Sequence, residues 1–319
     1  MVVHSVVTVG NFDGVHIGHR AILLRARHLA DQHNTTLKVI TFEPHPATVL
    51  RPDAVPPRIS DAEHKKRLLV DCGASQVDLL EPTSELLARQ PTQFIEQLVD
   101  DYQPIAIVEG VNFRFGKGRA GDVQLLESLS KRLNFTSVVV DPVDVVLNDM
   151  LVATASSSLI RWLVEHGRVA DAACCLGRAH TLTGHVITGD KRGRDIGVPT
   201  ANLDPQDYNG LLVPADGVYG GFVCLPEART YPAAISIGLK PTFAGQSRCI
   251  EAHLLDFDAD LYGQSIILHF TCWLRDQRPF FNVDALRRQL ERDIVDTRRL
   301  VYQGQFGPQS PTAPLSKTN

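Results

Sequence analysis

Two hydrophobic periodicities alternate along the first half of the chain. Short, continuous apolar runs predict buried strands at Ser5–Val9, Leu37–Phe42, Gln76–Leu80, Ile105–Glu109 and Ser137–Val146. Between them, apolar residues recur every three or four positions, which predicts helices at Ala21–His33, Ala62–Val70, Thr92–Asp101 and Val123–Leu133. This alternation is typical of βαβ units, so we predict a parallel sheet with helices on both faces. Ligands of such sheets bind beyond the carboxyl ends of the strands.

The pattern changes after two short helical segments, expected at 156–166 and 169–176, which end at Gly167 and Gly177. Short alternating runs then predict strands at His180–Thr188, Gly217–Leu225, Ala233–Gly238, Cys249–Phe257 and Ser265–Trp273, followed by a helix at Val283–Ile294. Many short strands favour a small β-barrel. We therefore predict an α/β plus β-barrel chain, with a Rossmann-like domain over residues 1–167, a barrel domain over 168–303 and a disordered tail over 304–319.

Composition narrows the classes of function. The length of 319 residues accommodates about two domains, and the net charge of −4 argues against a general nucleic-acid binder. No apolar run approaches the ~20 residues that a membrane span needs, and the N-terminus lacks the basic region of a signal peptide. The six cysteines show no C-x-x-C spacing, so neither a zinc site nor a disulfide framework is indicated, and we expect a reducing cytoplasm.

The stretch Thr8–His19, T-V-G-N-F-D-G-V-H-I-G-H, carries the clearest chemistry. It joins the first expected strand to a helical segment that we expect to open at His19. Glycines let backbone N–H groups approach an anion, and a helix start adds partial positive charge, so the loop suits a phosphate. His16 and His19 can both point at one phosphate and stabilise the charge that develops on it. A plain turn and a pair of metal-binding histidines are the alternatives.

This stretch is neither a P-loop nor a dinucleotide-binding fingerprint. It resembles the H-x-G-H signature of nucleotidylyltransferases. In its longer form, G-N-F-D-G-V-H-x-G-H, it resembles the start of the bacterial bifunctional riboflavin kinase/FMN adenylyltransferase (FAD synthetase) family, and the resemblance covers about residues 4–300. It implies catalytic roles for His16 and His19. The nucleotide- and flavin-binding positions that it implies in the same loop are Gly10, Phe12, Asp13, Gly14 and Gly18.

Two loops that follow later strands are candidates for the same site. Residues 110–122 resemble the family segment G-x-(D/N)-F-x-F-G-x-x-x-x-G-D, although propensity alone predicts a mobile surface loop. The resemblance implies that Asn112, Phe113 and Phe115 bind flavin and nucleotide. His45 lies in a proline-rich turn after the second strand, where it either sits near the phosphates or only fills the turn.

The segment Ser156–Arg161 resembles the family's S-S-T-x-I-R, with Ser158 at the usual threonine. Serines before an apolar periodic run are typical of a helix N-terminus, and this structural role is expected in any case. The resemblance adds that Ser157 and Ser158 bind the triphosphate of ATP, and that Arg161 stabilises the departing pyrophosphate.

The run from Gly189 to Asn202, G-D-K-R-G-R-D-I-G-V-P-T-A-N, joins glycines and cationic residues in a possible flap over phosphates. Thr200 and Asn202 place two neutral oxygens on one side of an extended chain, where they suit Mg²⁺. A charged surface hairpin is the alternative. The run resembles the P-T-A-N signature of riboflavin kinases, with Val198 at the usual phenylalanine. It implies a Mg²⁺–ATP site at Thr200 and Asn202, with nucleotide contacts from Gly189, Arg192 and Gly197.

Two residues of the second half complete the implied kinase site. Glu251, in I-E-A-H, is the implied general base for the ribityl 5′-hydroxyl, or else an ordinary strand glutamate. Arg275 either contacts the flavin or only pairs with Asp276 or Asp293.

The resemblance implies a cytoplasmic enzyme of two reactions. The barrel would phosphorylate riboflavin with ATP, and the first domain would transfer AMP from ATP to FMN, giving FAD and pyrophosphate. Mg²⁺ is the implied cofactor, and riboflavin, FMN, FAD and ATP are the implied partners, with neither nucleic acid nor membrane among them and the oligomeric state open. The alternatives are a nucleotidylyltransferase for another phosphorylated metabolite and a flavin-binding protein that no longer catalyses.

Overall fold

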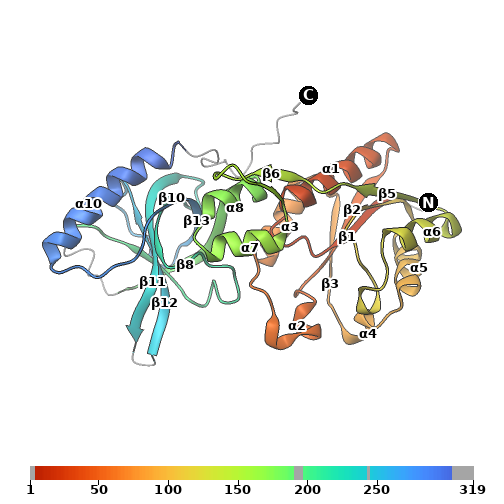
Figure 1. Ribbon diagram of the computed structural model, residues 1–319, viewed down its shortest axis with the longest axis horizontal. Coiled ribbons are helices and arrows are strands. Elements are labelled where there is room, and N and C mark those ends of the chain that lie inside the picture. Colours follow the sequence, from red (N-terminus) through yellow and green to blue (C-terminus); the bar gives the residue numbers. More distant parts are fainter. Residues whose placement is uncertain (1–3, 190–196, 243–244, 304–319) are drawn as a thin grey trace. The chain divides into compact units, whose positions relative to one another are not determined.

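The chain packs into two compact units (Figure 1). The computed structural model describes residues 4–189, 197–242 and 245–303, and only the backbone of residues 240–242 and 245–247. The first unit comprises residues 1–56, 61–145 and 154–156, and the second comprises residues 57–60, 146–153 and 157–319. The predicted α/β and barrel architectures are both confirmed. The predicted domain boundary at residue 167 stays a prediction.

The first unit is built on a five-stranded parallel sheet with the order β3-β2-β1-β4-β5. The strands are β1 (Ser5–Gly10), β2 (Thr36–Phe42), β3 (Gln76–Leu80), β4 (Pro104–Gly110) and β5 (Thr136–Val140). The chain winds outward from β1 through β2 and β3, and then returns to place β4 on the other side of β1. The switch point of the sheet, where ligands of such folds bind, therefore lies between the carboxyl ends of β1 and β4.

Helices cover both faces of this sheet because successive strand residues point to opposite sides. On one face, Val6 packs with residues of α1 (Ile17–Gln32) and α3 (Ala62–Asp71). On the other, Val7 packs with residues of α5 (Pro91–Tyr102) and α6 (Val123–Leu133). Two one-turn helices, α2 (Ala47–Leu50) and α4 (Ser84–Leu87), and two 3₁₀ turns, η1 (Pro52–Ala54) and η2 (Lys117–Arg119), lie in the connections.

The expected strand Ser137–Val146 is wrong as a single element. The structure ends β5 at Val140 and forms β6 (Asp144–Val146), which pairs with β7 (Val152–Thr154) in a separate two-stranded sheet. Pro142 stands in the interruption, and a proline cannot donate the N–H that a continuous ladder requires.

The second unit is a closed, antiparallel six-stranded barrel in the order β10-β11-β12-β9-β8-β13. Its strands are β8 (His180–Ile187), β9 (Ala201–Leu203), β10 (Gly217–Cys224), β11 (Thr230–Thr242), β12 (Gly245–Leu254) and β13 (Ser265–Arg275). Tyr219, Ile235 and Phe270 are fully buried in its core. The sequence pattern missed β9, which is only three residues long, and extended β12 to Phe257, whereas the strand ends at Leu254.

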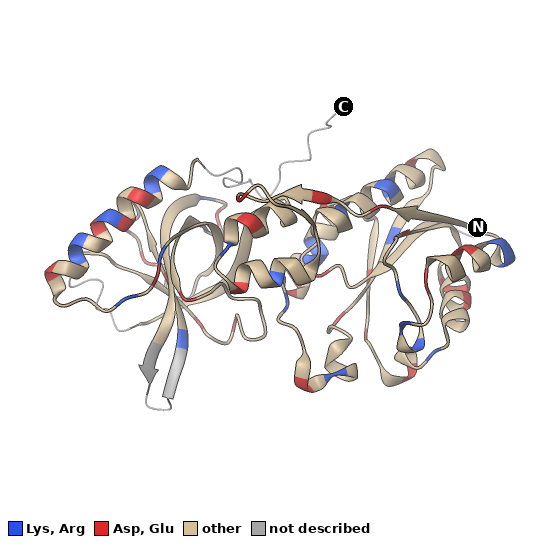
Figure 2. Ribbon diagram, in the orientation of Figure 1, with Lys and Arg blue, Asp and Glu red and all other residues tan. Residues whose placement is uncertain are grey.

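Within the described residues, three helices accompany the barrel strands. They are α7 (Ser157–Glu165), α8 (Val169–Leu176) and α10 (Val283–Leu300), which runs on beyond the expected end at Ile294. Gly177 takes the left-handed C-cap of α8 at φ 70°, as predicted. Acidic and basic residues are interspersed along α10 (Figure 2). The predicted disordered tail, 304–319, lies outside the described residues.

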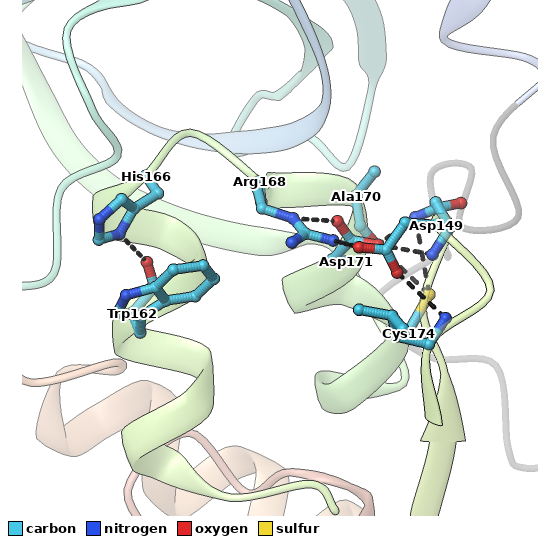
Figure 3. A network of polar contacts seen from close by, with 9 residues as sticks. Asp149, Trp162, His166, Arg168, Ala170, Asp171 and Cys174 are labelled. Carbon is cyan, nitrogen blue, oxygen red and sulfur yellow. Dashed lines mark hydrogen bonds and ion pairs between the residues drawn. The ribbon is translucent and has the colours of Figure 1, made fainter. Parts of the chain in front are cut away.

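A polar network fastens the tip of the β6–β7 hairpin to the start of α8 (Figure 3). The buried Asp171 carboxylate accepts hydrogen bonds from the backbone N–H of Asn148 at 2.7 Å, from its side-chain amide at 2.9 Å and from Nε of Arg168 at 2.7 Å. Arg168 also pairs with Asp149 at 2.5 Å, and these hydrogen bonds raise the pKa of Arg168 and lower that of Asp149. We call these four residues the hairpin clasp.

Candidate active sites

The loop after β1 leads directly into the first turn of α1. The expected helix start at His19 is wrong by two residues: α1 begins at Ile17, and His16 is its N-cap. Nδ1 of His16 accepts a hydrogen bond from the backbone N–H of His19 at 3.4 Å, so an imidazole takes the place of the usual Ser, Thr or Asp. The N-terminus of a four-turn helix therefore carries both histidines, and helix N-termini favour anions.

The two rings are held against each other by their surroundings. His16 and His19 stack with centroids 3.6 Å apart and an interplanar angle of 24°, and Phe12 meets the His19 ring edge-on at 5.2 Å. A Cβ on Gly18 would lie 3.1 Å from the His16 ring, so any larger residue would press on that ring. Phe12 and Val15 take positive φ values of 44° and 39°, which is unusual for residues other than glycine, above all for the β-branched Val15, and typical of strained functional loops.

His19 is the electrostatically distinctive residue of this loop. Burial lowers its pKa well below the usual histidine value, and the neighbouring His16 lowers it further. Its Nδ1 is buried and has no hydrogen-bond partner in the part of the chain that the structure describes. A neutral imidazole with an unsatisfied ring nitrogen is suited to hydrogen-bond a ligand oxygen.

Neighbouring loops supply the other predicted residues of the first unit. The ring of His45 links the loop to α2, with Nδ1 accepting from the N–H of Ala47 at 3.0 Å and Nε2 lying 3.2 Å from the Asn11 amide. Asn112 is exposed and Phe113 half-buried. Phe113 stacks at 5.1 Å on Phe115, which is only 5% exposed in the core. Of the three predicted residues in this segment, Asn112 and Phe113 therefore offer the surface that a ligand could contact.

The helix-start residues predicted to bind ATP stand on α7. Ser157 and Ser158 form its first turn, and Nε of Arg161 donates to the carbonyl of Pro57 at 2.7 Å. Both α7 and Pro57 belong to the second unit.

In the barrel, two predicted residues face each other across neighbouring strands. Asn202 on β9 pairs in register with Glu251 on β12, so their side chains lie on the same face of the sheet. Ala201 and Ala252 point into the core, which places the Asn202–Glu251 pair on the outer wall. The amide of Asn202 donates to the Thr200 carbonyl at 3.4 Å.

The backbone of Gly189 lies directly over Asn202. A Cβ at Gly189 would fall 2.6 Å from the Asn202 amide, so this close approach requires glycine. Gly197 has φ 79°. Arg192 lies outside the described residues.

The donor set of this wall fits a cation shared with a nucleotide. Among the described residues, no group of three or more His, Cys, Asp or Glu side chains could hold a metal. A hydroxyl on Thr200 and an amide oxygen on Asn202 are hard oxygen donors, and such a pair leaves coordination positions for phosphates and water.

In this structure Arg275 pairs with Asp293, which is one of the alternatives stated for it above. Its guanidinium binds the buried Asp293 carboxylate. Nη2 of Arg275 donates to Oδ2 at 2.7 Å, and Nε donates to Oδ1 at 3.0 Å. It also lies over the Phe280 ring at 5.6 Å. A flavin contact by Arg275 stays a prediction.

Comparison with known proteins identifies the family. A model described as FAD synthetase matches residues 2–153, and one described as riboflavin kinase matches residues 176–301. The bifunctional riboflavin kinase/FMN adenylyltransferase of Escherichia coli K12 is 32% identical over 297 residues, which cover 92% of this chain and 91% of that protein. The chain belongs to the bifunctional riboflavin kinase/FMN adenylyltransferase family.

Other relatives extend the match. The protein of the same name from Bacillus subtilis strain 168 is 33% identical over 300 residues, covering 92% of each chain. A solved structure named macrolide-efflux protein, from Streptococcus pneumoniae, matches with a TM-score of 0.84 and 30% identity, over 93% of this chain and 95% of that chain. None of the helices within the described residues is long and apolar enough to cross a membrane.

Two buried polar residues beside the β1 loop escaped the sequence analysis. Glu109 and Thr41 stand near the ends of strands β4 and β2 and were read only as parts of strand and turn. Glu109 could have been noticed in the sequence, since a carboxylate is unusual in a strand that is buried on both faces. Nothing in the sequence singled out Thr41, because threonine is common in strands.

Proposed function

We propose that the two reactions of this bifunctional enzyme use two different sets of residues. Adenylylation of FMN uses the loop that carries His16 and His19, and phosphorylation of riboflavin uses the barrel wall at Thr200, Asn202 and Glu251. The observation that carries the proposal is the stacked histidine pair at the N-terminus of α1, next to the switch point of the sheet, with a buried Nδ1 on His19 that has no partner among the described residues.

In adenylyl transfer, an oxygen of the FMN phosphate bonds to the α-phosphorus of ATP. The bond from that phosphorus to the bridging oxygen breaks, and pyrophosphate leaves with the electron pair. No strong base is needed, because a phosphate monoester is already ionised near neutral pH. His19 donates a hydrogen bond to a phosphoryl oxygen in its neutral form, and His16 supports the same group. Ser157, Ser158 and Arg161 bind the triphosphate by resemblance to the family pattern.

In phosphorylation, the ribityl 5′-oxygen of riboflavin bonds to the γ-phosphorus, and ADP leaves. Glu251 accepts the hydroxyl proton, a role supported by its place opposite Asn202 across β9 and β12. Thr200 and Asn202 hold the ATP complex through neutral oxygens. Mg²⁺, when bound with ATP, supplies neutralisation of the phosphate charge. The proposed cytoplasmic location is supported by six free cysteines.

A time course with the wild-type chain tests both activities together. Purified protein is incubated with riboflavin, ATP and Mg²⁺, and the flavins are separated by chromatography. We expect FMN to form first and then to give way to FAD. FMN that accumulates without FAD would contradict the adenylyl-transfer assignment. Failure to convert either riboflavin or added FMN would favour a flavin-binding protein.

A further inference from the structure

Strands β1 and β4 separate at the switch point before either strand ends. Their pairing runs from Ser5 opposite Pro104 to Val7 opposite Ile107, yet β1 continues to Gly10 and β4 to Gly110. In the gap that opens, the N–H of Val9 donates to Oε1 of Glu109 at 2.7 Å. A side chain of β4 therefore binds a backbone donor of β1 beyond the last register pair of the two strands.

The neighbouring strand holds the other side of the same turn. Oγ1 of Thr41, on β2, donates to the carbonyl of Asn11 at 3.0 Å, and the Thr41 side chain is fully buried. The backbone on either side of Gly10 is thus bound by one polar side chain from each flanking strand. We call Glu109 and Thr41 the loop clamp. One residue beyond Asn11, Phe12 packs on the ring of His19.

Glu109 is suited to this place because it can be uncharged. Only 2% of the residue is exposed, and burial raises its pKa well above the usual glutamate value, against the opposing effects of the Val9 N–H and the Thr8 hydroxyl. A carboxylate this close to a polyphosphate site would repel the ligand, whereas a neutral carboxylic acid keeps an acceptor oxygen for Val9 without adding negative charge.

We propose that Glu109 is a positioning residue for adenylyl transfer, which together with Thr41 fixes the turn at Gly10 and so the placement of His16 and His19. The inference rests on the assignment of adenylyl transfer to this loop under Proposed function. It requires that a neutral acceptor at position 109 is sufficient, and that loss of the acceptor impairs FMN adenylylation while riboflavin phosphorylation by the same chain is spared.

The test compares Glu109→Gln and Glu109→Ala in the full chain, with kcat and KM measured for both reactions below the melting temperature of each variant. Glutamine keeps a neutral acceptor, so adenylylation should stay within about twofold of wild type. Alanine should lower its kcat about tenfold or more, because small misplacements of reacting groups are costly. Phosphorylation should stay within about twofold in both variants. Thr41→Val should lower the kcat of adenylylation as Glu109→Ala does, and Thr41→Ser, which keeps the hydroxyl, should keep the wild-type kcat.

Ser5→Ala is the matched control. It removes a buried hydroxyl bond of 2.8 Å, from Ser5 to the carbonyl of Tyr102, at the opposite end of β1. The unfolding free energy of the Ser5→Ala variant should fall while the kcat of both reactions is unchanged. This result would distinguish an effect on the position of the histidines from a general loss of stability. The proposal is overturned if Glu109→Ala adenylylates normally, if Glu109→Gln is as impaired as Glu109→Ala, or if Ser5→Ala loses adenylylation equally. A wild-type chain without adenylylation would instead overturn the proposed function.

Discussion

His16 and His19 differ in what their ring nitrogens do. His16 uses Nδ1 to cap α1, whereas Nδ1 of His19 is buried without a partner among the described residues. Because burial keeps the pKa of His19 low, we expect it to offer a phosphate a hydrogen bond rather than a fixed charge. The motif spacing predicted two imidazoles near one anion, which stays a prediction, and the structure shows that their Nδ1 atoms have different surroundings.

Single substitutions should separate the two reactions. His19→Ala should lower FMN adenylylation about a hundredfold and leave riboflavin phosphorylation within about twofold, because it removes a donor to the reacting phosphate. Asn202→Ala should do the reverse, because it removes an oxygen from the ATP site of the barrel. Each reaction is measured separately, with added FMN for the first and riboflavin for the second. Loss of both reactions in either variant would contradict the assignment to two sites.

His180 links the stability of the barrel to pH. Burial lowers its pKa to about 4, and its Nε2–H donates to the Leu212 carbonyl at 2.8 Å. Between about pH 4 and 6.5 the unfolded chain therefore binds the proton more readily than the folded one. The unfolding free energy is therefore highest, as far as His180 determines it, above about pH 6.5. It falls by about 3 kcal/mol as the pH is lowered toward 4.

His180→Phe tests this linkage, because phenylalanine can keep the stacking on Phe270 but does not titrate. The difference in unfolding free energy between pH 6.5 and 4 should shrink by up to about 3 kcal/mol in the variant. Urea unfolding followed by tryptophan fluorescence measures it, since Trp162 and Trp273, the two tryptophans of the chain, both lie in the second unit. An unchanged pH dependence would show that His180 is not the titrating group.

At the scale of residues, the sequence indicates candidate chemistry more clearly than it indicates burial. The motifs at His16, Asn202 and Glu251 could be recognised because glycines, prolines and polar side chains stand out in sequence. The burial of Phe115 could not be judged, because it depends on partners far away in the chain, such as Phe94.

At the scale of elements, periodicity predicted long segments well and short ones poorly. Helices α6 and α8 begin and end where the pattern indicates. The three-residue strands β6, β7 and β9 are too short to show alternation, and their pairing comes from hairpin and barrel closure. The start of α1 was misjudged because sequence rules do not include histidine among the usual N-caps.

The hairpin clasp should be an element-scale determinant of stability. Asp171→Ala should lower the unfolding free energy of the second unit by about 3 kcal/mol, because it strands the Asn148 N–H and removes the buried partner of Arg168. Asp149→Ala removes only the more exposed partner of Arg168 and should cost less than about 1 kcal/mol. Tryptophan fluorescence in urea measures both variants. Equal losses of unfolding free energy in the two variants would show that the buried Asp171 carboxylate stabilises the unit no more than the Asp149 carboxylate does.

At the scale of the whole molecule, the two reactions share FMN as product and substrate. If FMN is released between them, a mixture of the His19→Ala and Asn202→Ala chains should convert riboflavin to FAD, although neither variant does so alone. Chromatography of flavins from the mixture and from each variant measures this. A mixture that makes FMN but no FAD, while the Asn202→Ala chain adenylylates added FMN, would contradict release of FMN into solution.

The packing units are not continuous in the sequence. Residues 57–60 belong with the second unit: the N–H of Arg58 donates to the Gly210 carbonyl at 2.9 Å, and the N–H of Leu212 donates to the Arg58 carbonyl at 2.7 Å. Residues 146–153 likewise pack with that unit, through the hairpin clasp. No single break in the coding sequence therefore yields two fragments that each hold one whole unit. In evolutionary terms, this interleaving is a barrier to gene fission.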